Sequence, residues 1–264
     1  MRQLVATYSG PIINVRRSSD NVTADFYTDA KQTYLTTGIN GTGTTYASWI
    51  GANTGYITKW YDQSGKGNHA TNSTTGTTQP NITKVASPGG TNYYVVQWQN
   101  ANSTVLNSTN PFSPNTIFSQ FYENISSSDF GTLIGTPYGG FISNIYRQVA
   151  LRLYTNSYLG SNYADWFFSN SGTKIAYQNG SNVSSNPTCI LYCNTTYDAS
   201  KWNRLSLSAS TTDPNVSSWG GMTVIGADPS SNVRSINGYM TDLLCHNTPM
   251  TATDMQQYYA NVLF

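Results

Sequence analysis

The feature that most constrains the fold of this chain is a series of short segments in which apolar or aromatic residues alternate with polar ones. This period-2 pattern places every second side chain on the same face of a β-strand. Turn-forming Gly, Pro, Asn and Ser residues bound the segments. Roughly ten such strands are typical of a β-sandwich or jelly roll rather than a parallel α/β fold. The predicted strands span Leu4–Tyr8, Ile12–Arg16, Val22–Tyr27, Tyr56–Tyr61, Tyr93–Trp98, Val149–Tyr154, Ile190–Cys193, Leu205–Ser208, Met222–Ile225 and Ile236–Leu244.

Two segments carry a helical pattern instead. Tyr46–Ile50 is a short apolar turn, and near the C-terminus Thr253 and Gln256 fit a capping box. Apolar residues then repeat at helical spacing: Met255, Tyr258, Tyr259, Val262 and Leu263. We therefore expect a short amphipathic C-terminal helix that packs against the sandwich.

The length of the chain suits a single large β-sandwich, since such domains commonly reach about 200–250 residues. Two stretches rich in Asn, Ser, Thr and Gly, 68–80 and 100–114, are flanked by strand-like segments. They are predicted to be long surface loops, not linkers between domains. We expect one domain over residues 1–264.

The composition disfavours several classes of protein. Asn, Ser and Thr make up 94 of the 264 residues, while charged residues are only 9% and the net charge is +1. No basic stripe is available to neutralise phosphates, so we expect no nucleic-acid partner. No apolar run reaches the roughly 18 residues of a membrane span, and the first residues lack the apolar core of a signal peptide. A hydrophobic fraction of 38% indicates a folded chain.

Neither the cysteines nor the histidines indicate a disulfide framework or a metal centre. Along a strand, Cys189 and Cys193 would lie about 13 Å apart, too far for a bridge, whereas Cys245 could pair with either. His69 and His246 occur without the spacing of a zinc site, and no calcium-loop motif is present. We expect no metal and no cofactor, and interpret the cysteines as small buried hydrophobic residues.

The most distinctive local motif runs from Trp60 to His69 and reads WYDQSGKGNH. Asp62 can accept hydrogen bonds from the amides of a tight turn, and Gly65 and Gly67 allow positive φ angles. The spacing of a phosphate-binding loop is absent. We interpret Asp62, Gly65 and Gly67 as a structural turn, with direct contact to a ligand as the alternative.

Several segments of the sequence resemble a known family. They are Val5–Gly10, Val15–Asn21 and Tyr56–His69 near one end, and Val224–Asp228 and Asn237–Met240 with the closing helix near the other. These segments are similar to the catalytic domain of arabinofuranosidase B, in family 54 of the glycoside hydrolases. The resemblance implies an all-β, concanavalin A-like β-sandwich. It also suggests a virion or phage-tail setting, because large DNA viruses of algae and phages carry similar domains.

The resemblance also bears on catalysis. Asp228 matches the family's general acid/base, although Ala227 replaces a neighbouring glycine. The family's nucleophile is a Glu that follows paired cysteines, but the corresponding region here, 126–135, reads SSSDFGTLIG. The one Glu in the chain, Glu123, lies upstream and does not match. A retaining glycosidase needs two carboxyl groups, so the missing nucleophile motif argues against an enzyme.

We therefore predict a non-catalytic surface module of a virion or of the extracellular space, structural or lectin-like. Sugars stack on aromatic rings, and Trp219 and Asp228 are the candidate carbohydrate-binding residues. The expected partners are glycans or neighbouring structural proteins, including copies of the chain itself. The alternative is an exo-acting glycosidase of arabinofuranosidase type, with Asp228 as acid/base and Asp129 or Glu123 as nucleophile. A purely architectural protein is the third possibility.

Overall fold

A computed structural model gives the fold of the chain. It describes residues 1–87, 89–112, 115–123, 131–135, 141–142, 145–146, 150–154, 163–167, 174–178, 181–182, 192–196, 202–209, 222–226 and 236–260. Strands dominate these ranges, and the pairings between them are antiparallel.

The N-terminal part of the chain forms a sheet whose central strand is β1 (Ile13–Arg17). It pairs with β2 (Thr23–Phe26) on one side and β3 (Gly55–Trp60) on the other. Beyond β3 the sheet divides, because Tyr56 pairs with β5 (Asn81–Ala86) whereas Trp60 pairs with β4 (Ala70–Thr71). Two series of strands therefore diverge from β3.

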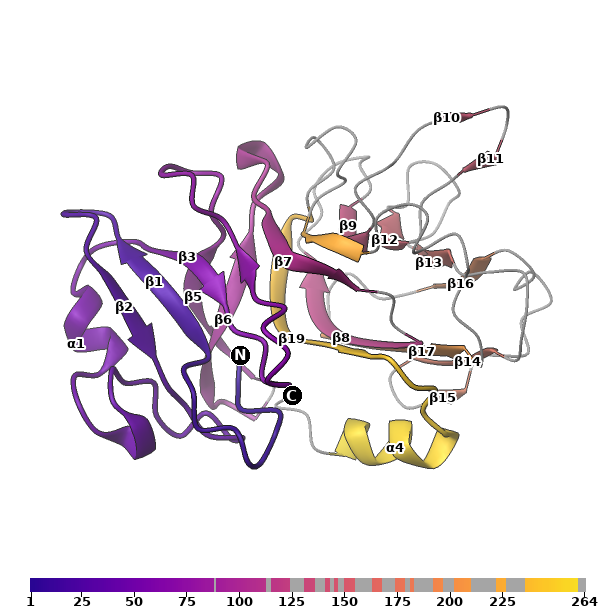
Figure 1. Cartoon of the computed structure of the whole chain (residues 1–264), viewed down its shortest axis with the longest axis horizontal. Coiled ribbons are helices and arrows are strands. Elements are labelled where there is room, and N and C mark those ends of the chain that lie inside the picture. Colours follow the sequence, from indigo (N-terminus) through magenta and orange to yellow (C-terminus); the bar gives the residue numbers. More distant parts are fainter. Residues whose placement is uncertain are drawn as a thin grey trace.

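The first series forms one layer of the sandwich. It continues from β5 to β6 (Asn92–Trp98), β19 (Gly238–His246), β8 (Thr116–Glu123), β17 (Asn203–Ala209), β14 (Lys174–Gln178) and β15 (Ser181–Asn182). The strand β19 lies between β6 and β8, so a late part of the sequence joins two early strands (Figure 1).

The second series forms the facing layer. It continues from β4 to β7 (Leu106–Phe112), β18 (Met222–Ile225), β9 (Gly131–Gly135), β12 (Ala150–Tyr154), β13 (Tyr163–Phe167) and β16 (Tyr192–Thr196). A separate hairpin joins β10 (Phe141–Ile142) and β11 (Ile145–Tyr146). Figure 1 shows β8, β17 and β14 opposite β9, β12 and β13.

The main hydrophobic core contains side chains from both layers. Its largest fully buried members include Trp98, Phe26 and Phe121. The C-terminal helix α4 (Ala252–Ala260) instead covers the outer side of the first layer, where Met255 and Tyr258 contact Phe118 (Figure 1). The predicted all-β sandwich with a short C-terminal helix is confirmed.

The cap of α4 differs from the predicted pair Thr253 and Gln256. The amide of Asp254 donates to Oγ1 of Thr251 at 3.2 Å, and Oδ2 of Asp254 accepts from the amide of Thr251 at 2.9 Å. The capping box therefore lies two residues earlier, with Asp taking the part that Glu or Gln usually has. Tyr259 lies in α4 but its side chain is outside the described part, and residues 262 and 263 are outside it altogether.

The predicted strand at 4–8 and the two predicted loops also differ from the structure. Leu4–Tyr8 forms a turn instead of a strand, because side chains satisfy its backbone: the carboxamide of Gln3 donates to the carbonyls of Val5, Ala6 and Tyr8. The predicted loop 100–114 contains the 3₁₀ helix η2 (Asn100–Asn102) and all of β7, while the predicted loop 68–80 contains β4.

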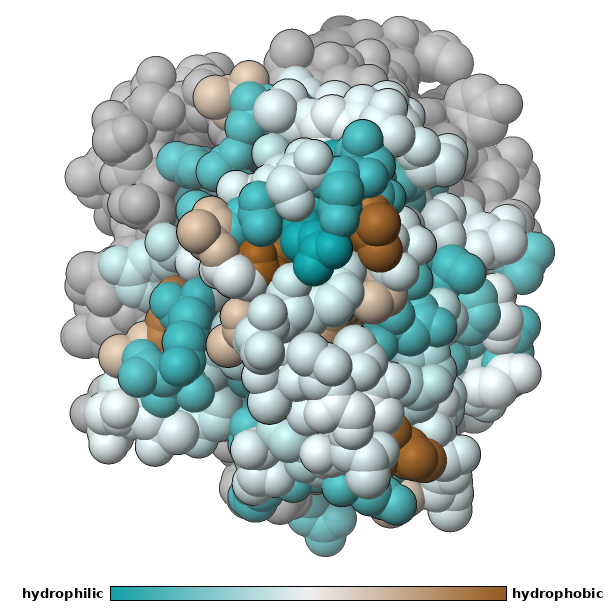
Figure 2. All heavy atoms as spheres, turned by 90° about the vertical axis from the view of Figure 1, so that its left-hand side faces the viewer, coloured by the Kyte–Doolittle hydropathy of each residue, from teal (hydrophilic) through white to brown (hydrophobic). Residues whose placement is uncertain are grey.

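Short helical turns complete the N-terminal part. The predicted turn at 46–50 is the helix α1 (Tyr46–Ile50), capped by Thr45, whose Oγ1 accepts from the amide of Ser48. A second 3₁₀ helix, η1, spans Ile39–Gly41. None of the helices in the described ranges has the length and apolar character to cross a membrane. The face in Figure 2 is mostly polar, and in the described ranges the exposed large hydrophobic residues are Val5, Val22 and Ile39.

Candidate functional site

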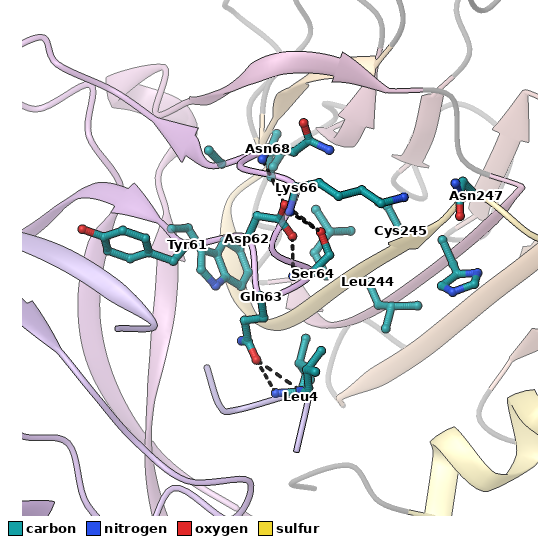
Figure 3. A pocket seen from close by; sticks show the side chains of 16 residues that line it. Leu4, Tyr61, Asp62, Gln63, Ser64, Lys66, Asn68, Leu244, Cys245 and Asn247 are labelled. Carbon is teal, nitrogen blue, oxygen red and sulfur yellow. Dashed lines mark hydrogen bonds between the residues drawn. The ribbon is translucent and has the colours of Figure 1, made fainter. Parts of the chain in front are cut away.

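A pocket lies between the turn that follows β3 and the C-terminal end of β19 (Figure 3). Its volume of about 480 Å³ is within the range of small-molecule sites. Leu4, Val5, Ile225, Leu243 and Leu244 contribute apolar side chains, and the turn contributes polar ones. The walls thus come from parts of the chain that are far apart in the sequence.

Asp62 organises the turn that forms one wall. Its Oδ1 accepts from the amide of Ser64 at 2.8 Å, and its Oδ2 accepts from Oγ of Ser64 at 2.8 Å and from the amide of Asn68 at 3.0 Å (Figure 3). Gly65 and Gly67 have φ angles of 79° and 75°, which glycine adopts without strain. The geometry is that of a tight turn that is held together by the carboxylate of its first residue.

The same hydrogen bonds define what Asp62 can do chemically. Partial burial by itself would raise the pKa of the carboxyl group, but the donors on Ser64 and Asn68 outweigh it, and His69 adds to their effect. The pKa of Asp62 therefore lies below its usual value. The group stays ionised near neutral pH, so it is unsuited to donate a proton to a substrate.

Gln63 attaches the N-terminal segment to the pocket. Its Oε1 accepts from the amides of Leu4 and Val5 at 2.6 and 3.3 Å, and its Nε2 donates to the carbonyl of Arg2 at 2.9 Å. These bonds place Leu4 and Val5 in the pocket wall. No local sequence pattern indicates this role of Gln63, because all three partners lie about sixty positions away.

The imidazole groups near the pocket are engaged by neighbouring groups, and the thiol group is kept protonated by burial. His69 Nδ1 accepts from the amide of Asp62 at 3.1 Å, which leaves its ring proton on Nε2. His246 Nδ1 lies 2.7 Å from Oγ1 of Thr248. Cys245 is a free thiol whose pKa is raised by burial and by the negative charge of Asp62, so it stays protonated and is a poor nucleophile.

Three polar side chains at the pocket remain available to a ligand. Within the described ranges, the carboxamides of Asn68 and Asn247 form no hydrogen bond, and Lys66 forms no ion pair. Figure 3 shows Lys66 extending from the turn toward the side that carries Cys245 and Asn247. Amide and ammonium groups beside an apolar wall suit a sugar, which has hydroxyl groups and apolar C–H faces.

The predicted carbohydrate-binding residues Asp228 and Trp219 lie outside the described residues, as does Asp129. Glu123 is the last residue of β8, and its backbone lies opposite Gly238 of β19. In the described part of the chain, no three His, Cys, Asp or Glu side chains converge in a way that could hold a metal ion.

Strand β18 connects the pocket to the chain segment that carries Asp228. Ile225, its last residue, lines the pocket, and Asp228 follows three positions later. The intervening Gly226 has a φ of 86° and lies against the ring of Trp98 so closely that a Cβ atom would come within 2.1 Å of it. The amide of Ile236 donates to the carbonyl of Gly226 at 3.0 Å. Gly226 is therefore firmly positioned directly after β18.

Residues 1–113 match the family model "Alpha-L-arabinofuranosidase B, catalytic". This range contains β1 to β7 and the whole Asp62 turn. No curated protein matches the chain.

The fold is similar to solved arabinofuranosidase structures. One is an arabinofuranosidase complexed with arabinofuranosyl-α-1,2-xylobiose, with a TM-score of 0.61 and 13% identity. Another is a glutamate-to-glutamine mutant of a family 54 α-L-arabinofuranosidase soaked with 4-nitrophenyl α-L-arabinofuranoside, with a TM-score of 0.58 and 14% identity. Each match covers 99% of this chain but 60% of the other. At this identity the likeness establishes the fold, and it agrees with the predicted concanavalin A-like sandwich.

Proposed function

We propose that this chain is a glycoside hydrolase of arabinofuranosidase type, which removes terminal arabinofuranosyl or related furanosyl units from glycans. The observation that carries the proposal is the match of residues 1–113 to the arabinofuranosidase B catalytic model. That range supplies the Asp62 turn and the N-terminal wall of the pocket. The sandwich similarity over 99% of the chain supports the same fold for the remainder.

The register of the strands favours Glu123 as the partner of Asp228. Glu123 lies opposite Gly238, and Gly238 lies opposite Trp98, so the three backbones form one row across the first layer. The ring of Trp98 reaches Gly226, two positions before Asp228. The row thus approaches Gly226, directly after β18, from the facing layer.

In the proposed reaction, Asp228 protonates the glycosidic oxygen while the bond from that oxygen to the anomeric carbon breaks. Glu123 attacks the anomeric carbon and forms a glycosyl ester. Water then attacks the same carbon, gives its proton to Asp228 and releases Glu123 as a carboxylate. This retaining route requires the two carboxyl groups to lie about 5–5.5 Å apart.

Hydrolysis of 4-nitrophenyl α-L-arabinofuranoside tests the proposal. The purified chain should release nitrophenol, and Asp228→Asn and Glu123→Gln should each lower kcat by at least about a thousandfold. Asp20→Asn, which changes an exposed carboxylate paired with Arg17, is the matched control and should retain full activity. A folded wild-type chain that releases no nitrophenol would refute the proposal, and full activity in Glu123→Gln would refute that assignment.

A second candidate is a non-catalytic glycan-binding module on a virion surface or outside the cell. The specific observation in its favour is that 126–135 lacks the nucleophile motif of the resembling family, with Glu123 the one Glu of the chain. Binding on a glycan array without hydrolysis would favour this candidate, and Trp219→Ala should then weaken binding. Hydrolysis that depends on Asp228 would contradict it.

A further inference from the structure

The neighbouring residues Tyr61 and Asp62 direct their side chains to different parts of the protein. Both residues border the pocket, but Asp62 holds the pocket turn, whereas the ring of Tyr61 extends in the direction opposite to Lys66 (Figure 3). Its hydroxyl donates to Oδ1 of Asp25 on β2 at 2.8 Å. Tyr61 follows β3, and β1 lies between β2 and β3, so this side chain reaches across the sheet.

A second chain of hydrogen bonds fixes the same carboxylate. Thr58 Oγ1 donates to Oδ1 of Asn14 at 2.5 Å, and Nδ2 of Asn14 donates to Oδ1 of Asp25 at 2.7 Å. Both donors to Asp25, Asn14 and Tyr61, therefore act on one oxygen. In the described ranges the other oxygen, Oδ2, accepts no hydrogen bond, and the half-buried carboxylate is held in place with this oxygen available.

Tyr61, Tyr8 and Tyr27 lie near this carboxylate. Tyr27 follows Asp25 by two positions, and among described residues its side chain makes no hydrogen bond or ring contact. The hydroxyl of Tyr8 donates to the carbonyl of Pro11 at 2.8 Å. Burial, with Asp62, Tyr27 and Asp25 nearby, raises the pKa of Tyr8 to about 12. The phenol of Tyr8 therefore remains a neutral hydrogen-bonding group near Asp25 at physiological pH.

The charges of Lys59 and Asp25 limit the class of ligand that could bind here. Lys59 Nζ lies 5.0 Å from the centre of the Tyr61 ring, and Lys59 pairs with Asn14, the residue that also pairs with Asp25. The ammonium group disfavours a metal cation, and the carboxylate disfavours an anion. An oriented carboxylate oxygen beside half-exposed tyrosines instead suits a neutral ligand with adjacent hydroxyl donors and apolar C–H faces.

We propose that Asp25, Tyr27 and Tyr8 form a second carbohydrate-binding site, separate from the pocket, on the outer face of the β1–β2–β3 sheet. Oδ2 of Asp25 accepts hydrogen bonds from sugar hydroxyls, and Tyr27 packs against the sugar ring. The choice of an arabinoxylan as the polymer that this site holds rests on the proposed function, but the site itself does not require hydrolysis.

Affinity gel electrophoresis through arabinoxylan tests the site. All variants in this experiment also carry Asp228→Asn, which should prevent hydrolysis and keep the polymer intact. The chain should be retarded, and Asp25→Asn should weaken binding about tenfold, as expected for a lost hydrogen bond to a charged group. Asn retains an acceptor for Asn14 and Tyr61, so this variant should fold. Tyr27→Ala should weaken binding as well, and Asp20→Asn should not.

Three outcomes would overturn the site: no retardation of the folded chain, equal retardation of Asp25→Asn, Tyr27→Ala and the control, or retardation that EDTA abolishes. Release of nitrophenol from 4-nitrophenyl α-L-arabinofuranoside, measured on Asp25→Asn in the otherwise wild-type chain, separates the two proposals. Unchanged release with weaker polymer binding supports both. Weaker polymer binding in a chain that never releases nitrophenol supports the site and refutes only the hydrolase.

Discussion

Arg2 and Asp242, 240 positions apart in the sequence, form an ion pair that is almost fully buried. Nε of Arg2 donates to Oδ2 of Asp242 at 3.0 Å, while among the described residues Oδ1 of Asp242 has no hydrogen-bond partner. The pair attaches the N-terminal segment, and with it Leu4 and Val5 of the pocket, to the strand β19.

Removing one member of this pair should destabilise the protein strongly. Asp242→Asn leaves the charge of Arg2 buried without its counter-ion and should lower the free energy of unfolding by about 3–5 kcal/mol. The double variant Arg2→Met, Asp242→Leu should recover most of that loss, because it removes both desolvated charges. Urea denaturation of the single and double variants measures the coupling. A double variant as unstable as the sum of the singles would contradict this account.

Asp62→Asn should loosen the pocket turn in a pH-dependent way. The substitution replaces a carboxylate that accepts three hydrogen bonds with a neutral amide, which weakens these bonds. It should lower the free energy of unfolding at pH 7 by about 1–2 kcal/mol. Because the pKa of Asp62 is depressed in the folded state, its contribution is present above the unfolded pKa and lost as pH falls through the folded one. The difference between wild type and variant should therefore shrink in acid, as urea denaturation at pH 7 and pH 3 can show.

Gly226→Ala should be far more disruptive than a similar change in the turn. The new Cβ atom would lie 2.1 Å from the ring of Trp98, which is fully buried, so we expect a loss of about 2–4 kcal/mol. Gly65→Ala shares the positive φ but meets no atom within 4 Å and should cost about 1–2 kcal/mol. Thermal unfolding compares the two, and equal losses would show that the Trp98 contact is unimportant.

Stability should decline in alkali because buried tyrosines resist ionisation. Burial, and then the neighbouring Tyr94, raise the pKa of Tyr46 well above its usual value. Above the unfolded pKa of about 10 the unfolded chain loses a proton that the folded chain keeps, so the free energy of unfolding falls as pH rises. Tyr46→Phe should reduce this slope by up to about 1.4 kcal/mol per pH unit. Denaturation curves between pH 9 and 11.5 give the slopes, and identical slopes would contradict the assignment.

Alternation along the sequence was sufficient to predict strands where the two faces of a strand differ in polarity. β3 is an example, with Ile57 buried between the more polar Tyr56 and Thr58. Strand β8 was missed because Ser119 and Gln120 are as buried as the adjacent Phe121, so no simple alternation marks it. Its burial depends on β17 and β19, which pair with it from distant parts of the sequence.

The site was only partly predictable for the same reason. The Asp62 turn depends on residues within six positions, so its hydrogen bonds could be anticipated from the local motif. The opposite wall, at Leu244, comes from a strand about 180 positions later. The contact between Asp25 and Tyr61 also depends on the register of three strands, which the sequence pattern does not specify.

The position of β19 between β6 and β8 affects how the chain can fold during synthesis. During synthesis β6 and β8 are complete once Glu123 has been made, but the strand between them begins only at Gly238. At usual translation rates, two strand edges therefore stay open on each nascent chain for on the order of ten seconds. Open edges pair readily with other chains. Production of this protein should thus be governed by how well the cell protects the growing chain until its last strand arrives.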